Sequence, residues 1–519
     1  MCHNILLKLK RQPFKGCLFS KAGSEAVPEQ IVYRETIKNY SLYFQINTED
    51  IEKKKRIISM KKRIIGIILF IIVFAGAILA EPAGDLTSEG MKALAVLLMA
   101  VILWITEPMP AGATAIFIMI LPMLLGISTF RQTIAPFANP TIFFVIATFG
   151  LSAAIAKVPL AKRILLLLLK LLGESIEKII FALIIATALI SSVMSNIPAT
   201  LMFMGVALSL LDLYDTDEEK CRTGRTLMIA LPLAGMMGGS ITPAGSSNNL
   251  LALSLLHDNA GTAVSFVDWI AVCLPVSVLM LPIAWFILIK IFKPAPVRKE
   301  RLNEFLDELR SLPKPEAKEY IVMVIYVSMI TLWILSSWFP VLDTTVVAII
   351  GLAVMFLPGI DLFTWKEFSE EVSWSTILMT GSVLCIGSLI NTSGVASWFA
   401  DSFFSIQSGG SMFFLILQLA LFMFVMQVIL PNGPAAITAT AVPVIAAAQA
   451  AQINPSVLVI PLTFFCSWAM ILPLNPVPML TYSKGYYKVT DIGKAGIPVL
   501  IILSLIMALW VPFITELIF

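Results

Sequence analysis

Charged side chains are scarce in this chain: 13% of its 519 residues are charged, whereas 58% are hydrophobic. A soluble protein of this length needs a more strongly charged surface, so the bilayer must provide most of its solvent. Apolar runs of about 17 to 30 residues recur along the chain, and each can cross a hydrocarbon core about 30 Å thick. Because backbone groups in lipid must bond internally, these runs are predicted to be α-helices.

Cysteine and histidine form no pattern that indicates a metal centre. The six cysteines are scattered, with no Cys-x-x-Cys pair and no histidine at metal-ligand spacing. They are interpreted as reduced or lipid-buried thiols.

The N-terminal arm, residues 1–63, lacks both a long apolar run and the pattern of a signal peptide. It holds 14 of the 36 Lys and Arg residues, but no nucleic-acid-binding fold surrounds them. A cytoplasmic flank is therefore favoured over a nucleic-acid partner. Met60 and the three basic residues after it would make a typical start for an inner-membrane protein. The first 59 residues are expected to be a disordered arm or the product of a start site placed too early.

Two polar, proline-containing segments interrupt the hydrophobic stretches and match each other at an offset of 236 residues. Residues 195–200 read SNIPAT and residues 431–436 read PNGPAA, so Asn, Pro and Ala coincide. A second pair, NPTI at residues 139–142 and WSTI at residues 374–377, begins corresponding segments at an offset of 235. A duplicated helix break at membrane depth is typical of secondary transporters, whose substrate site forms where the two repeats meet.

The predicted fold is an all-α polytopic membrane protein with two inverted repeats, about 11 transmembrane helices and two re-entrant hairpins. The first helix and repeat 1 occupy residues 64–292, a charged cytoplasmic linker occupies 293–318, and repeat 2 occupies 319–519. Each repeat contains one hairpin and then one broken helix, predicted at residues 179–211 and 226–256 in repeat 1 and at 412–447 and 457–482 in repeat 2.

Clusters of Lys and Arg determine the predicted orientation, because such clusters favour the cytoplasmic side. All of them reach that side if the hairpin at residues 179–211 opens to the cytoplasm and the hairpin at 412–447 opens to the outside. The N-terminus is then cytoplasmic and the C-terminus external. The expected location is a prokaryotic inner or plasma membrane.

Each predicted hairpin tip places Asn beside Pro, a pair that suits the start of a helix. Half-helix N-termini would point N–H groups and a partial positive charge toward the membrane centre, where an anion is favoured. Carbonyl groups freed by the breaks can bind a hard cation such as sodium. The substrate-binding candidates at the tips and broken helices are Asn196, Thr200, Thr242, Ser246, Asn432, Asn475 and Pro478.

The candidate core has no titratable side chain: residues 179–211, 226–256 and 402–483 contain no Asp, Glu, Lys, Arg or His. Proton-coupled carriers usually use an intramembrane carboxylate or histidine as the relay. A metal-cation couple or plain exchange is therefore favoured over proton coupling. An intramembrane enzyme or sensor is disfavoured, because it needs a catalytic carboxylate, histidine or serine–base pair, or a soluble output domain.

Structural roles are the alternatives to these site assignments. A lone Asn in a membrane helix commonly joins two helices, but the matched pair Asn196 and Asn432 at two breaks favours a site. Ser191, four residues before Ser195, could line a cation site or bond back along its own helix. Both readings of Ser191 stay open at the level of sequence.

The chain resembles the divalent-anion/sodium symporter family, which comprises sodium–dicarboxylate, citrate and sulfate carriers, over residues 64–519. The family repeats a Ser-Asn-Thr signature at its two hairpin tips, where this chain reads SNI and PNG. The second broken helix, around residues 472–478, resembles the family more loosely than the first does. The first matches the family in Gly239, Thr242, Pro243 and Gly245.

The resemblance implies a homodimer of scaffold and transport domains with an elevator movement, sodium as the coupling ion and no other cofactor. It also implies that the Thr hydroxyls that contact substrate carboxylates in the family are missing at both tips, and that the second sodium site has lost its Ser. The sodium-binding candidates are Ser191, Ser195, Asn196, Gly238 and Gly239 for the first site, and Asn432 and Leu474 for the second.

The leading interpretation of function is sodium-coupled symport of a small di- or tricarboxylate. The alternative is a sodium-independent anion exchanger, or a carrier for an inorganic oxyanion such as sulfate, on the same fold. Either interpretation makes the chain a transporter of a small anion across the bilayer rather than an enzyme.

Overall fold

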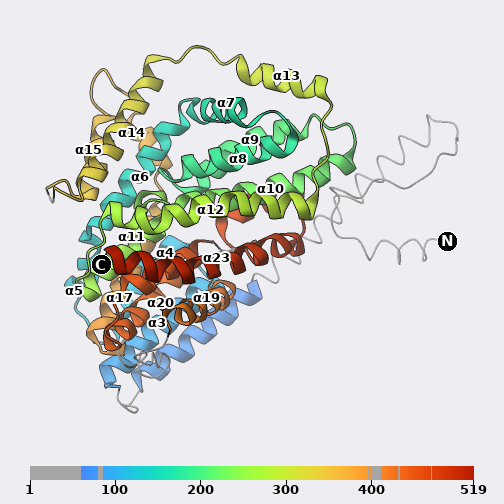
Figure 1. The fold of residues 1–519 in the computed structure, drawn as a ribbon. Coiled ribbons are helices and arrows are strands. Elements are labelled where there is room, and N and C mark those ends of the chain that lie inside the picture. The colour runs from blue at the N-terminus through green and yellow to red at the C-terminus, as the bar shows by residue number, and fades with distance from the viewer. Residues whose placement is uncertain are drawn as a thin grey trace, which may run out of the picture.

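Helices dominate the computed structural model of the chain (Figure 1), which describes residues 60–79, 86–339, 341–395, 398, 411–430, 433–468 and 470–518. Seven described helices are long and apolar enough to cross a membrane, or eight if a pair bent by 45° counts as one span. The prediction of an all-α polytopic membrane protein is confirmed. Other predicted spans correspond to helices that are short or divided at a break.

The N-terminal helices pack side by side through small and aromatic residues. A helix over residues 60–78 contacts the next elements through Gly66, which lies against Thr106, and through Phe70, whose ring lies 5.4 Å from that of Phe117. The following elements are α3 (Ser88–Thr106), α4 (Ala111–Leu124), α5 (Phe130–Ile134), η1 (Ala135–Ala138) and α6 (Pro140–Ala156). The side chains of Thr87, Thr129 and Asn139 cap the starts of three of them, α3, α5 and α6.

The apolar segment over residues 141–172 is divided into two helices in the structure. α6 ends at Ala156, and a separate helix, α7 (Leu160–Leu172), follows. Pro159 has no N–H to continue the α6 hydrogen bonds. α7 also carries Lys162, Arg163 and Lys170, and charges are costly at membrane depth, so a separate helix keeps them at the surface.

The two halves of the chain show the same order of elements: a helical hairpin, a helix interrupted by a polar stretch, and one long helix. In the first half these are α8 (Ile176–Ser191) and α9 (Asn196–Leu211), then α10 (Asp217–Gly239), η2 (Pro243–Gly245) and α11 (Ser247–Ala260), then α12 (Phe266–Phe292). In the second half they are α19 (Met412–Ile429) and α20 (Gly433–Ala450), then α21 (Ser456–Ser467) and α22 (Pro476–Tyr482), then α23 (Val489–Ile518).

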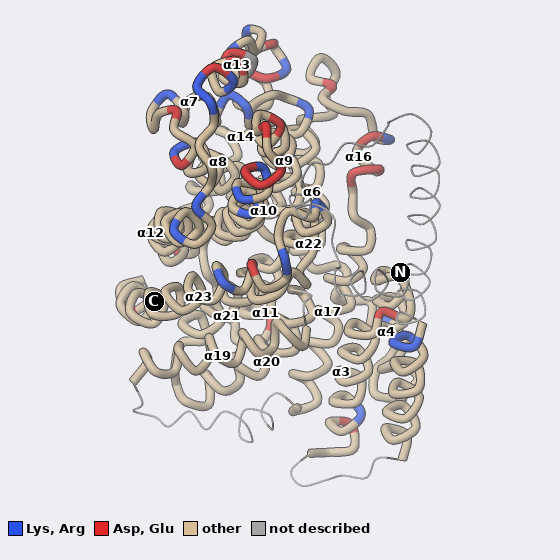
Figure 2. The backbone as a smooth tube through the Cα atoms, turned by 90° about the vertical axis from the view of Figure 1, so that its right-hand side faces the viewer, with Lys and Arg blue, Asp and Glu red and all other residues tan. Residues whose placement is uncertain are grey.

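Charged residues gather around α7 and α13 (Lys299–Arg310) at one end of the molecule (Figure 2). Two ion pairs dock α13: Arg301 contacts Asp215 at 2.6 Å, and Arg310 contacts Glu174. Nearby, the Tyr214 hydroxyl donates to the Ala295 carbonyl at 2.6 Å, and burial raises the pKa of Tyr214 to about 12. Four described helices precede the second hairpin: α14 (Ala317–Leu335), α15 (Thr344–Val354), α16 (Trp365–Glu371) and α17 (Trp374–Thr392).

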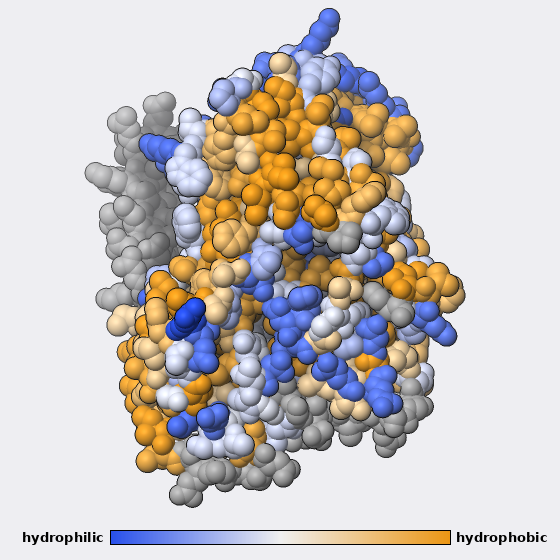
Figure 3. All heavy atoms as spheres, turned by 90° about the vertical axis from the view of Figure 1, so that its left-hand side faces the viewer, coloured by the Kyte–Doolittle hydropathy of each residue, from blue (hydrophilic) through white to orange (hydrophobic). Residues whose placement is uncertain are grey.

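A broad apolar surface covers the face on the side of α14 and α15 (Figure 3). Val324 and Val327 of α14 are each 64% exposed, and Ile350 of α15 is 50% exposed. Large apolar side chains that point out of a helix bundle indicate a lipid or protein neighbour rather than water. This face is therefore suited to the bilayer.

The two halves of the chain pack into each other rather than side by side as separate units. α11 of the first half packs against α20 and α21 of the second, and α22 of the second half packs against α9 and α10 of the first. Each of these helices begins or ends at a hairpin tip or at a break. The polar interruptions of the two halves are thus brought to the same region.

Candidate functional site

The first hairpin tip forms a compact group of oxygen atoms. Ser191 is fully buried, and its Oγ lies 2.7 Å from the Gly235 carbonyl oxygen and 2.9 Å from Asn196 Oδ1. A hydroxyl has one proton, so it donates to only one of these two oxygens in the orientation that the structure gives Asn196. Ser191 therefore faces the tip and α10, in addition to any contact with its own helix. An excess of acceptor oxygens is the composition that suits a hard cation.

The glycines of α10 allow the first tip to approach closely. A Cβ atom at Gly239 would lie 1.9 Å from Asn196 Oδ1, and one at Gly238 would lie 2.2 Å from the Ala188 carbonyl oxygen. Neither glycine has a positive φ, so the close approach, rather than backbone conformation, requires them. The structure thus brings together four of the predicted sodium-binding residues: Ser191, Asn196, Gly238 and Gly239.

Side chains hold the polar stretch between α10 and α11 in place. Asn249 Nδ2 donates to the carbonyl oxygens of Gly239 and Thr242, each at 2.8 Å. The Thr242 hydroxyl donates to the Ser192 carbonyl oxygen at 2.5 Å. Asn249 Oδ1 is buried and has no hydrogen-bond partner within the described ranges. Thr242 therefore joins the break to the hairpin tip, and Asn249 leaves an oxygen free beside them.

Three other first-half candidates have different surroundings. Thr200 is fully buried on α9, and its hydroxyl lies 2.6 Å from where Gly235 would carry a Cβ, on the α10 side of the hairpin. Ser195 precedes α9, and its N–H donates to Ser152 Oγ at 3.4 Å. Ser246 uses its hydroxyl to accept from the Asn248 N–H at 3.3 Å, as the cap of α11. Thr200 Oγ1 is buried and has no hydrogen-bond partner among the described residues, whereas Ser195 and Ser246 are engaged with protein groups.

At the second hairpin tip the structure describes the residues before position 431 and after position 432. Pro431 and Asn432, the latter a candidate for both substrate and sodium binding, lie outside the described residues. Gly433 begins α20, and its carbonyl accepts from Cys466 Sγ at 3.5 Å. The 236-residue offset pairs Ser191 with Gln427, whose Nε2 donates to the Phe465 carbonyl. Gln427 Oε1 is buried and unpartnered among the described residues.

The second break has its own caps. Asn475 precedes α22, and its Oδ1 accepts from the Val477 N–H at 3.1 Å. Leu474 is 41% exposed. The buried Pro478 offers its carbonyl to the Tyr487 hydroxyl at 2.9 Å and to the Thr481 hydroxyl at 3.1 Å. These candidates therefore lie at the N-terminal end of α22, the helix that packs against α9 and α10.

A direct hydrogen bond joins the two breaks. Trp468 directly follows α21 and Ser240 directly follows α10, and Trp468 Nε1 donates to Ser240 Oγ at 3.0 Å. The Ser240 carbonyl in turn accepts from Trp269 Nε1 at 3.1 Å. The repeat offset does not indicate this contact, because Trp468 and Ser240 are not at equivalent positions of the two repeats. Sequence reasoning missed this hydrogen bond and the buried side chains of Asn249 and Gln427. Only Gln427 could have been found from the sequence, because the 236-residue offset pairs it with Ser191.

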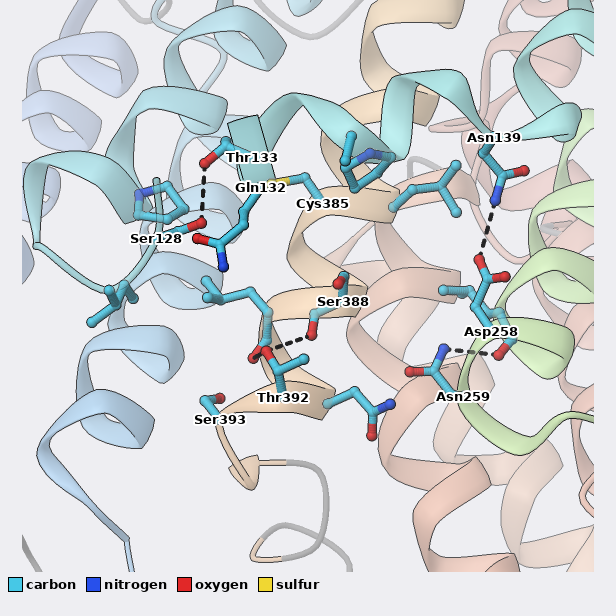
Figure 4. A pocket seen from close by; sticks show the side chains of 18 of the residues that line it. Ser128, Gln132, Thr133, Asn139, Asp258, Asn259, Cys385, Ser388, Thr392 and Ser393 are labelled. Carbon is cyan, nitrogen blue, oxygen red and sulfur yellow. Dashed lines mark hydrogen bonds between the residues drawn. The ribbon is translucent and has the colours of Figure 1, made fainter. Parts of the chain in front are cut away.

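One cavity is lined by residues other than those of the two hairpin tips. It has a volume of about 760 Å³ and is lined at one side by the C-terminal ends of α11 and α17 (Figure 4). Two of its lining residues are hydrogen-bonded: Asn139 Nδ2 donates to Asp258 Oδ2 at 3.1 Å. Glu89 and Asp258 line it, and none of its lining residues is Lys, Arg or His. Because two carboxylates repel a dianion, the electrostatics favour the tips as the anion site.

Comparison with known proteins gives concordant results. The model of the family described as "Sodium:sulfate symporter transmembrane region" matches residues 61–516. Proteins named sodium-dependent dicarboxylate transporter SdcS, from Staphylococcus aureus strains bovine RF122 / ET3-1 and MRSA252, are 26% identical over 497 residues, covering 90% of this chain and 94% of theirs. Each name describes the relative that carries it.

Two solved structures share the fold at 14% sequence identity. MtrF of Neisseria gonorrhoeae, described as illuminating a class of antimetabolite efflux pumps, has a TM-score of 0.53 and covers 87% of this chain and 94% of its own. The YdaH transporter of Alcanivorax borkumensis has a TM-score of 0.50, with coverage of 73% and 86%. At this identity the likeness concerns the arrangement of helices alone.

Proposed function

The chain belongs to the sodium:sulfate symporter family and is a sodium-coupled membrane transporter, and from that premise we propose that it takes up a small di- or tricarboxylate together with sodium. The observation that carries the proposal is the oxygen group of Ser191, Asn196 and Gly235 at the first tip, packed against the glycines of the break. A hard cation fits uncharged oxygen ligands of this kind. The names of the Staphylococcus aureus relatives support a dicarboxylate.

Helix ends and amides would neutralise the anion, because the hairpins and breaks contain no Asp, Glu, Lys, Arg or His. α9, α11, α20 and α22 all begin at a tip or a break, where the positive end of a helix dipole favours negative charge. A co-bound sodium would supply the full positive charge that the protein lacks. We assign Asn196, Thr242, Ser246, Asn432, Asn475 and Pro478 to the surroundings of the anion, and Thr200 to a position behind the tip.

A second candidate function follows from the differences between the repeats. Ser191 and Ser195 correspond to Gln427 and Pro431 at the 236-residue offset, so the second tip lacks both hydroxyls. A site with fewer hydroxyl ligands favours weaker coupling to sodium. Sodium-independent exchange, or transport of an inorganic oxyanion such as sulfate, is therefore the alternative. In either case we propose a homodimer with a cytoplasmic N-terminus and an elevator movement.

Counterflow in proteoliposomes separates these functions. Purified protein is reconstituted, and uptake of radiolabelled succinate or sulfate is measured with sodium outside, with sodium replaced by choline, and with unlabelled anion inside. The symport proposal predicts succinate accumulation that requires inward sodium and no internal anion. Uptake that needs internal anion and is indifferent to sodium would establish exchange instead.

A further inference from the structure

The Asn248 side chain lies where the two repeats meet, beside Gly433. Asn248 is the second residue of α11, directly after the first break. Its backbone N–H bonds to Ser246 Oγ at 3.3 Å, but its side-chain amide makes no hydrogen bond with a described residue. The residue is half-buried. An amide with two donors and two acceptor positions is thus held beside the break without a protein partner.

Gly433, the first residue of the second tip's rear helix, provides the space for this amide. A Cβ atom on Gly433 would lie 2.4 Å from Asn248 Nδ2 and 2.8 Å from Asn248 Oδ1. The φ angle of Gly433 is not in the left-handed region, so its backbone does not require glycine. Glycine is needed at position 433 for space, because the Asn248 amide occupies the volume that a side chain there would fill.

The same approach brings two helix N-termini together. Asn248 is at the start of α11 and Gly433 at the start of α20, and the two helices pack against each other. The positive ends of both helix dipoles favour an anion. The Asn248 amide lies against Gly433 at the start of α20 and can donate two hydrogen bonds.

We propose that Asn248 contacts the transported anion and determines how tightly it binds, and that Gly433 is needed to let the amide reach that position. This inference rests on the proposed function and adds a residue to its site. An amide N–H bonded to a charged oxygen is worth about tenfold or more in affinity.

A double-mutant cycle on the full-length protein tests the proposal. Asn248→Ala, Gly433→Ala and the double variant are compared by thermal stability in sodium chloride alone and with added succinate or sulfate. Asn303→Ala, on the exposed face of α13, and Gly205→Ala, where a Cβ meets nothing within 4 Å, are matched controls. The readout is the anion concentration that gives half of the maximal shift in Tm.

Asn248→Ala is expected to raise that concentration about tenfold or more and to leave the shift caused by sodium alone unchanged. Gly433→Ala should have a similar effect by displacing the amide, yet add little in the Asn248→Ala background, where its methyl group meets empty space. Equal anion affinity in Asn248→Ala and the parent protein, or a full effect of Gly433→Ala in both backgrounds, overturns the inference alone. If neither anion shifts the parent protein, the proposed function fails as well.

Discussion

Replacing Ser191 by alanine removes the hydroxyl at the centre of the first-tip oxygen group. That hydroxyl lies 2.7 Å from the Gly235 carbonyl oxygen and 2.9 Å from Asn196 Oδ1, in a residue with no exposed surface. Its loss removes this buried hydrogen bond, which is worth about 0.5–1.5 kcal/mol for a neutral pair and about 1.5–3 kcal/mol next to a charge. If the same hydroxyl is a sodium ligand, the substitution destabilises the sodium-bound state more than the sodium-free state. Sodium affinity should therefore drop about tenfold to a hundredfold.

The assay is sodium-dependent stabilisation of the purified protein, followed by sodium-dependent uptake in proteoliposomes. Thr187→Val is the matched control: Thr187 is also buried on α8, but its hydroxyl donates to the Leu183 carbonyl of its own helix at 2.7 Å. The control should lose stability without losing sodium affinity. An unchanged sodium concentration for half-maximal uptake in Ser191→Ala would refute the assignment of the oxygen group as a cation site.

Three further predictions concern the same region. Gly239→Ala places a methyl group 1.9 Å from Asn196 Oδ1 and should abolish sodium-induced stabilisation, measured as a shift in Tm. Trp468→Phe, which removes the 3.0 Å bond to Ser240 Oγ, should slow uptake several-fold; Ser240→Ala should add nothing to it, and additive effects would exclude the coupling. Succinate uptake should be flat between about pH 7 and pH 9, since the hairpins and breaks lack Asp, Glu, Lys, Arg and His; a titration step there would imply a proton relay.

Much of the fold was predictable because hydrophobic runs and their interruptions are strong signals in a membrane protein. The hairpin turns at Ser195 and the break after Gly239 were visible as polar residues within apolar sequence. The division between α6 and α7 is hard to predict from sequence because leucine occupies residues 165–169, 171 and 172. In that segment the periodicity of Lys162, Arg163 and Lys170 was a better guide than total hydropathy.

The candidate site was only partly predictable, because much of it arises from contacts between distant segments. The role of Gly239 as a space for Asn196 follows from packing that no local pattern indicates. The same holds for Asn248 over Gly433 and for Trp468 bonded to Ser240. Pairing by the repeat offset finds equivalent positions such as Ser191 and Gln427, but it does not show which side chains cross from one repeat to the other.

The most direct test of the account is a cryo-EM structure of the purified protein in sodium and succinate, compared with one in choline and no anion. The account predicts succinate density within hydrogen-bonding distance of Asn196 and Asn248, and a sodium-sized peak beside Ser191, both absent in choline. Succinate density confined to the cavity between Asp258 and Thr392, with none at the two tips, would contradict it.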